Sequence, residues 1–420
     1  MQPSSVRTAG GVGPRILFLA EGATLAHVAR PFVLAEGLAG NGYEVLFACP
    51  EDYSWVARGA EFRVANLQSQ PAAIFAARLR KGAPLYDEKT LAGYVEDDLA
   101  LLDREQPDVV IGDFRISLAV SARLRNVPYV NVCDAYWSPE LPLDPPLPSL
   151  PLTRMLPISL ASVLFRAFSG IGLKLHALPM ERLRARYGLP SLGHDLRLCY
   201  TDADLRLFAN FPALFPAAGP SDRSAFVGPV EWSPRATAEI PVIPGEGPRV
   251  YVTMGSSGDP AVLASLLPVL AAEGCRSYVA TAGKPLPGGV PLHAAHVADY
   301  LPGREMCAGA DLVVCNGGSP TTNQALMHGT PVLGIASNMD QFLNMRAIER
   351  YGAGRTIRAD RVDAGAVRVA LRDLLSGDGY RRRAGDLAAS VDSRGPSRIL
   401  AHHVDALLRR HDRTAAARID

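Results

Sequence analysis

Lysine is scarce in this chain: only four of its 420 residues are lysines. The one Gly-Lys step, Gly283-Lys284, is followed by Pro285, whereas a phosphate-binding P-loop requires Ser or Thr there. P-loop nucleotide chemistry is therefore excluded. The chain also has no excess of one charge, because it contains 43 Lys and Arg and 42 Asp and Glu, which gives a net charge of +1. Such a balance produces no field that attracts nucleic acid, so we expect no nucleic-acid partner.

Close cysteine pairs are lacking as well. The six cysteines stand apart, several of them in apolar runs, which predicts buried thiols in a reducing, cytoplasmic compartment. Residues 1–14 are small and polar, without the apolar centre of a secretion signal, and are expected to be a disordered tail. With 48% hydrophobic residues and a mean hydropathy of +0.08, the chain is predicted to be globular and long enough for two domains.

Short apolar runs alternate with amphipathic stretches twice along the chain. The predicted strands are 16–20, 44–49, 108–113 and 128–132, followed by 250–254, 277–281, 311–315 and 331–335. This alternation predicts an α/β fold in which each parallel sheet is covered by helices on both faces. We expect an N-terminal domain over 15–230, a proline-rich linker over 231–248 and a C-terminal domain over 249–396. A final helix is expected over 397–412, and a crossing back to the first domain stays open.

Two stretches interrupt the alternation. Residues 139–151 are rich in proline and are predicted to run extended. Residues 155–178 are strongly apolar, but their longest uncharged run, 155–165, is much shorter than the roughly 20 residues that span a bilayer, so no membrane-spanning helix is expected. Two interpretations remain open for this stretch: helices that cover the core of the first domain, or a mobile apolar lid over a hydrophobic substrate, which could also rest on a membrane surface.

Residues 315–329, Cys-Asn-Gly-Gly-Ser-Pro-Thr-Thr-Asn-Gln-Ala-Leu-Met-His-Gly, follow a predicted strand. Ser319 is expected to cap a helix that starts at Pro320 and ends before Gly329. A Gly-Gly turn that leads into a helix presents free backbone N–H groups and the positive end of the helix dipole, which suits a pyrophosphate. An ordinary strand-to-helix turn would have the same pattern.

A second polar loop follows the next predicted strand. Asp340 and Gln341 stand side by side there, and together they can hydrogen-bond several sugar hydroxyls. The succession of Gly317-Gly318, a helix, Gly329-Thr330-Pro331 and Asp340-Gln341 resembles the donor-binding signature of nucleotide-sugar glycosyltransferases. The resemblance is to the GT-B superfamily that includes UDP-glucuronosyltransferases and macrolide glycosyltransferases, and it extends over most of 15–353.

The resemblance also implies roles in the N-terminal half. His27 follows a small-residue loop after the first strand, like the catalytic histidine of that superfamily, and Asp113 ends a strand where the superfamily has the aspartate that orients this base. His27 would take the proton of an acceptor hydroxyl while Asp113 stabilises the imidazolium, with inversion at the anomeric carbon. Further donor contacts are implied for a set of loop residues: Gly255, Ser256, Tyr300, Asn316, Gly317, Gly318, Ser319, Thr321 and Gln324.

Two residues depart from the superfamily pattern, in which His usually stands at the position of Asn316 and Glu at that of Gln324. Each amide keeps a hydrogen bond but carries no charge, so these residues either tune the donor site or mark a degenerate one. A metal site is the competing chemistry, since Asp202 and Asp204 have the spacing of metal-dependent transferases and residues 96–98 are acidic. No histidine ligand stands nearby, so we interpret both clusters as solvated faces or caps and expect no metal.

The sequence therefore predicts an inverting, metal-independent hexosyltransferase that uses a UDP- or dTDP-sugar as co-substrate and needs no cofactor. The acceptor is expected to be an apolar small molecule or lipid that binds near Trp137, Phe165 and Phe168. A peripheral membrane contact and the oligomeric state are left open. Two rivals remain: a nucleotide-sugar epimerase of similar architecture, and a non-catalytic binding protein of the same fold.

Overall fold

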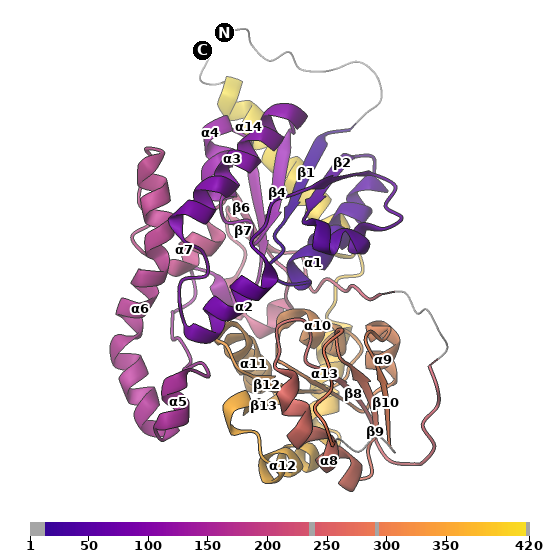
Figure 1. Cartoon of the computed structure of the whole chain (residues 1–420). Helices are drawn as coiled ribbons and strands as arrows, with labels where there is room; N and C mark the ends of the chain where they lie inside the picture. The colour runs from indigo at the N-terminus through magenta and orange to yellow at the C-terminus, as the bar shows by residue number, and fades with distance from the viewer. Residues whose placement is uncertain (1–12, 235–239, 290–293, 417–420) are drawn as a thin grey trace.

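A computed structural model describes residues 13–234, 240–289 and 294–416, and within them the chain forms two α/β domains (Figure 1). The N-terminal sheet has the order β3-β2-β1-β4-β5-β6-β7 and the C-terminal sheet the order β10-β9-β8-β11-β12-β13. Every strand pair within both sheets is parallel. The prediction of two doubly wound halves is confirmed.

The strand bounds lie within a few residues of those predicted. The N-terminal sheet consists of β1 (Arg15–Ala20), β2 (Glu44–Cys49), β3 (Arg63–Asn66), β4 (Val109–Asp113), β5 (Tyr129–Cys133), β6 (Leu205–Phe208) and β7 (Ser224–Phe226). The C-terminal sheet consists of β8 (Arg249–Thr253), β9 (Arg276–Ala280), β10 (Ala295–Ala298), β11 (Leu312–Cys315), β12 (Val332–Ala336) and β13 (Gly354–Arg358).

Helices connect these strands. Those of the first domain are α1 (Ala26–Ala39), α2 (Ala72–Lys81), α3 (Glu88–Glu105), α4 (Leu118–Arg125), α5 (Pro151–Met155), α6 (Ile158–Arg186) and α7 (Leu196–Thr201). Those that follow the linker are α8 (Leu263–Ala272), α9 (Gly303–Gly309), α10 (Ser319–Met327), α11 (Met339–Tyr351), α12 (Ala364–Leu375), α13 (Gly379–Ala389) and α14 (Pro396–Ala416).

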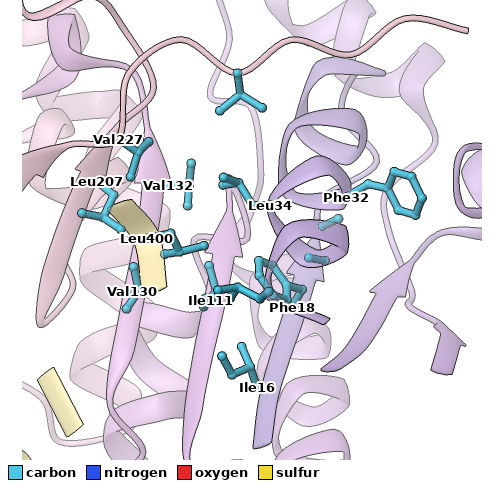
Figure 2. Packing of buried hydrophobic residues seen from close by; sticks show 14 of the residues in the cluster. Ile16, Phe18, Phe32, Leu34, Ile111, Val130, Val132, Leu207, Val227 and Leu400 are labelled. Atoms are coloured by element: carbon cyan, nitrogen blue, oxygen red, sulfur yellow. The ribbon is translucent and has the colours of Figure 1, made fainter. Parts of the chain in front are cut away.

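The first domain's core joins strands from the whole sheet to the last helix of the chain. Phe18 of β1 pairs with Phe47 on one side and Ile111 on the other, and all three are fully buried. Leu400 of α14 packs into the same cluster (Figure 2). The hydroxyl of Tyr43 donates to Asp405 of α14 at 2.8 Å. The final helix therefore lies against the first domain although it follows the second in sequence.

The proline-rich stretch crosses from one domain to the other. Residues 139–150 form no helix or strand. The backbone N–H of Ser149 donates to the carbonyl of Ser337 at 2.7 Å, and Arg358 donates to the carbonyl of Leu147, also at 2.7 Å. The extended conformation leaves these backbone groups free to bond across the domain boundary. The first domain is thus tied to the loops of the second.

Helix α6 is 29 residues long and runs unbroken through Gly170, Gly172 and Pro179. Its second half covers the domain, because Ala177, Met180 and Leu183 are buried against α3 and α7. Its first half is largely exposed, and Figure 1 shows the helix along the outer flank of the molecule. By length and composition it could cross a membrane, and it is the helix of the described chain that passes that test.

Candidate active site

The site begins where two neighbouring strands of the first sheet end. Ala20 of β1 lies in register with Asp113 of β4, and the loop that follows β1 leads into α1, whose second residue is His27. His27 Nδ1 lies 2.9 Å from Asp113 Oδ1, and the imidazole stacks on Phe114 with ring centroids 4.7 Å apart. The structure therefore joins the histidine and the aspartate that the sequence suggested as a pair.

Arg30, one helical turn after His27, shares the same carboxylate. It donates to Asp113 Oδ2 at 2.6 Å and Oδ1 at 2.9 Å, and to Asp134 Oδ2 at 3.1 Å. Burial favours the neutral form of Asp113, but the charge and hydrogen bonds of Arg30 outweigh it and hold the pKa of Asp113 below its usual value. Burial likewise opposes the charge of Arg30, yet Asp113 and Asp134 raise its pKa above the usual range.

This buried charge cluster decides the tautomer of the histidine. Asp113 remains a carboxylate and can only accept, so His27 Nδ1 must carry the proton in their hydrogen bond. The lone pair of the neutral ring is then on Nε2. The side chain of His27 retains 19% of its exposure, whereas Asp113 retains none. Nε2 is thus the ring atom that a hydroxyl could approach.

A cavity between the domains adjoins this cluster. From the first domain it is lined by the loop before His27 and by Arg30. From the second domain it is lined by most of the residues expected to bind the donor, namely Gly255, Ser256, Tyr300, Asn316, Gly318, Ser319, Thr321 and Gln324. Parallel strands place the loops at their carboxyl ends on one edge, which explains why residues far apart in sequence meet here.

The Gly-Gly turn enters the cavity with one correction to the predicted helix start. Gly318, not Ser319, is the N-cap of α10, and Pro320 is the second helical residue. Gly317 does not line the cavity. Its φ is +79°, and a Cβ there would lie 2.7 Å from Met345 Cγ, so glycine is required for backbone shape rather than for ligand contact.

The two departures from the superfamily pattern both face the cavity and both have partners. Asn316 donates to Ser257 Oγ at 3.0 Å and accepts from the Gly318 N–H at 3.1 Å, which joins the loop after β8 to the Gly-Gly turn. Gln324 donates to the carbonyl of Trp232 at 3.2 Å. A Cβ on Gly303 would lie 2.3 Å from Gln324 Oε1, so the amide is held against backbone that only glycine permits.

Asp340 and Gln341 do not line this cavity. Asp340 accepts from Trp137 Nε1 at 2.9 Å and from the Tyr136 hydroxyl at 3.0 Å. Burial and then the charge of Asp134 raise the pKa of Asp340. Gln341 forms a capping box with Asn338 at the start of α11, and its Nε2 is buried without a hydrogen-bond partner. Trp137, expected to bind the acceptor, thus contacts the second domain's sugar-binding candidate instead.

Aromatic residues form one wall of the cavity. Tyr300 lies 5.8 Å from Trp55, and Trp55 lies 5.7 Å from Trp232, measured between ring centroids. Tyr300 and Trp232 line the cavity. Tyr300 remains 47% exposed and offers a ring face to a planar ligand.

Phe165 and Phe168 lie on α6 and are not among the residues that line the cavity. Phe168 is 62% exposed. The expectation that they bind the acceptor came from their apolar character, and the helical conformation of residues 158–186 directs this part of the chain along the outside of the domain.

The acidic clusters are engaged in structural pairs. Asp202 pairs with Arg123 and Arg184, and Asp204 accepts from the N–H of Tyr129. Asp98, expected to be solvated, is fully buried against Arg115; this expectation was wrong because the paired guanidinium compensates the burial of the carboxylate. Within the described ranges no group of three or more His, Cys, Asp or Glu side chains could hold a metal ion. All six cysteines are free and buried, as predicted.

Several residues of the site were not anticipated. Arg30 stands three residues after His27, so helical spacing could have placed it on the same face. Asp134 follows β5 just as Asp113 ends β4, and a search of strand ends could have found it. Trp232 was assigned to the linker, and only the folded chain shows that it lines the cavity.

Two parallel α/β domains, a His–Asp pair that adjoins the cavity between them and a Gly-Gly loop on the other side of that cavity define a glycosyltransferase of the GT-B fold. Residues 280–407 match the family model described as erythromycin biosynthesis protein CIII-like, C-terminal domain. The chain belongs to the glycosyltransferase family that contains the PGL/p-HBAD biosynthesis enzymes of mycobacteria.

The PGL/p-HBAD biosynthesis glycosyltransferase of Mycobacterium tuberculosis is 41% identical over 398 residues, which cover 94% of this chain and 92% of that protein. The PGL/p-HBAD biosynthesis rhamnosyltransferase of Mycobacterium bovis is 42% identical over 398 residues, which cover 94% and 88%. Among solved structures, the spinosyn rhamnosyltransferase SpnG complexed with thymidine diphosphate is similar in fold, with a TM-score of 0.64 and 19% identity, covering 92% of this chain and 98% of that one.

Proposed function

We propose that this glycosyltransferase moves a hexose from a UDP- or dTDP-sugar to a hydroxyl of an apolar small molecule or lipid, with inversion and without a metal ion. The proposal rests chiefly on the 2.9 Å contact between His27 and Asp113 beside a cavity lined by the Gly-Gly loop. His27 Nε2 takes the acceptor's proton as the hydroxyl oxygen attacks the anomeric carbon. The nucleoside diphosphate leaves from the opposite face of the sugar, so the configuration at that carbon inverts.

The donor half of the proposal is supported by the second domain. The start of α10 offers backbone N–H groups and a helix dipole to a pyrophosphate, which could replace the charge of a metal ion. The aromatic wall of Tyr300 and Trp232 suits a nucleobase. Thymidine diphosphate in SpnG and the rhamnosyl transfer named for the mycobacterial relative favour a dTDP-deoxyhexose among the candidates.

The acceptor half is supported by the surroundings of the site and by the relatives. Phe114 stacks on the imidazole, and with Phe75, Tyr86 and Tyr200 it forms an aromatic cluster next to His27. An apolar aglycone with a hydroxyl fits such surroundings better than a charged one. The relatives act in PGL/p-HBAD biosynthesis, and we propose an acceptor of related apolar character for this chain. The six buried free thiols favour a reducing, cytoplasmic location for the reaction.

The first experiment is calorimetric titration of the purified protein with UDP, dTDP and GDP in the presence of EDTA. Binding of one nucleotide in preference to the others supports a metal-independent donor site and selects the sugars for an acceptor screen. The anomeric configuration of the product, read by NMR coupling constants, then tests inversion. Retained configuration would contradict the direct attack assigned to the His27-assisted hydroxyl.

The non-catalytic alternative has one specific observation in its favour, the uncharged Asn316 and Gln324 in the donor cavity. If no nucleotide binds to the wild-type protein or to Asn316→His, the donor site is degenerate and the non-catalytic alternative is preferred. If nucleotide binds and the donor is isomerised without an acceptor, the epimerase alternative is preferred.

A further inference from the structure

The first half of α6 exposes an apolar stripe that nothing in the described chain covers. Phe168, Ile171 and Leu175 recur at spacings of three and four residues and therefore share one face of the helix, with Leu160 on the same face three turns before Ile171 and Val163 at its edge. Phe168 is 62% and Ile171 60% exposed. Met155, at the end of α5 just before this helix, is 82% exposed. Exposed large side chains in one continuous stripe indicate a contact surface.

The exposed charges carried by this part of the chain are all of one sign. No Asp or Glu occurs between Asp144 and Glu181, and Glu181 itself is buried, where it accepts from the N–H groups of Leu192 and His194. Four exposed cations accompany the stripe along the helix: Arg166, Lys174, Arg182 and Arg186. None of them makes an ion pair within the described ranges.

Neighbouring elements extend this surface. His176 of α6 contacts the carbonyl of Gly82 at 3.1 Å, so the end of α2 lies beside the helix. Arg80 and Lys81 at that end are exposed, which adds two cations. At the other end, α5 is tied to the second domain, since Arg361 donates to the carbonyl of Thr153 at 2.6 Å. The stripe therefore starts beside the boundary between the domains.

The packing of α6 argues against a helix that crosses a bilayer. Its second half is buried against α3 and α7. Its first half follows directly after α5, which is hydrogen-bonded to Arg361 of the second domain. Only the outward face of the first half is available. An apolar face with lysine and arginine but no acidic residues is the pattern of a helix that lies in the membrane interface.

We propose that the outward face of α6, with Met155 and the cations beside it, docks on the surface of a bilayer that contains anionic lipids. A second copy of the chain is the less fitting occupant. Pairing two such faces would bring Lys174 and Arg182 of one copy towards those of the other, and the faces carry no carboxylate to compensate them. Anionic headgroups supply that compensation, and acyl chains accept the apolar stripe.

The test is flotation of the full chain with liposomes of phosphatidylcholine, with and without phosphatidylglycerol. We expect binding to the anionic liposomes that weakens with added salt. Phe168→Asp/Ile171→Asp should abolish flotation, and Lys174→Glu should weaken the partition coefficient by about fivefold or more, since each basic residue near an anionic surface contributes about that factor. The matched controls are Val369→Asp on α12, where Val369 is 64% exposed, and Arg382→Glu on α13; both should float like the wild type.

Titration with dTDP verifies that each variant keeps its donor site, so loss of flotation is separable from loss of the fold or of the proposed activity. Equal flotation of the wild type and Phe168→Asp/Ile171→Asp would overturn the proposal. So would a wild-type dimer, measured by light scattering without lipid, that becomes monomeric in the same variant, because the stripe would then bind a second copy.

Discussion

The cluster of His27, Asp113 and Arg30 leads us to predict how substitution of Arg30 changes the pH dependence of catalysis. His27 Nδ1 and Arg30 Nη2 both lie 2.9 Å from Asp113 Oδ1, so they lie within about 6 Å of each other. At an effective dielectric constant of 20, two positive charges at that separation repel by about 3 kcal/mol. Arg30 is therefore a positive charge that would repel an imidazolium at position 27, and its removal is the perturbation tested.

Replacing Arg30 by Met removes this repulsion. Because His27 is partly solvated, we expect less than the full effect: the midpoint of the acid limb of kcat/KM against pH should rise by about one to two pH units. Asp134→Asn should lower that midpoint, since it removes a carboxylate 3.1 Å from Arg30 and so leaves the positive charge of the guanidinium less compensated. The paired measurement is the pH profile of kcat/KM for both variants and the wild type.

Stability is the control for this experiment. Arg30 is buried between two carboxylates, and breaking such a pair costs about 3 to 5 kcal/mol, so thermal unfolding must verify that Arg30→Met is folded at the assay temperature. Arg30→Lys keeps the charge and should keep the acid limb near that of the wild type even where it lowers stability. An acid limb that stays in place in a folded Arg30→Met protein, or that moves the same way in both variants, would refute the electrostatic argument.

Further predictions concern single residues of the site. His27→Ala should lower kcat by about 10² to 10⁴ while calorimetric nucleotide affinity stays unchanged; full turnover would exclude His27 as the base. Asn316→His should strengthen nucleotide binding by adding a charge-assisted hydrogen bond, and an affinity that falls would mean that the contact of Asn316 with Ser257 matters more. Asp340→Asn should raise the melting temperature at pH 7, because desolvation and the charge of Asp134 raise the folded-state pKa of this half-buried carboxyl, and the protein then loses stability as the pH rises from the unfolded pKa, near 4, through the folded one; a lower melting temperature would contradict the cost assigned to this charge. Gly317→Ala should destabilise the protein by about 1 to 3 kcal/mol in denaturant titrations, because alanine meets both a positive φ and Met345; unchanged stability would mean that the turn can reshape.

The sequence by itself determined the architecture and the principal pair of the site. Strands such as 16–20 and 108–113 are short apolar runs that alternate with amphipathic stretches, so local chemistry was sufficient to predict two parallel sheets. The resemblance to the GT-B superfamily paired His27 with Asp113, and the parallel register of Ala20 with Asp113 explains why the two side chains meet.

The burial and the partners of several side chains were decided only by the tertiary structure, because they depend on contacts between segments that are distant in sequence. Asp98 was predicted to be solvated, but in the folded chain it is paired with Arg115. Trp232 was assigned to the linker, but it lines the cavity between the two domains. Phe165 and Phe168 looked like acceptor contacts because composition records that a residue is apolar but not what it faces. Whether a side chain is buried, and with which group it pairs, depends on a second segment that packs against it. The pattern of residues within one segment therefore cannot predict either property.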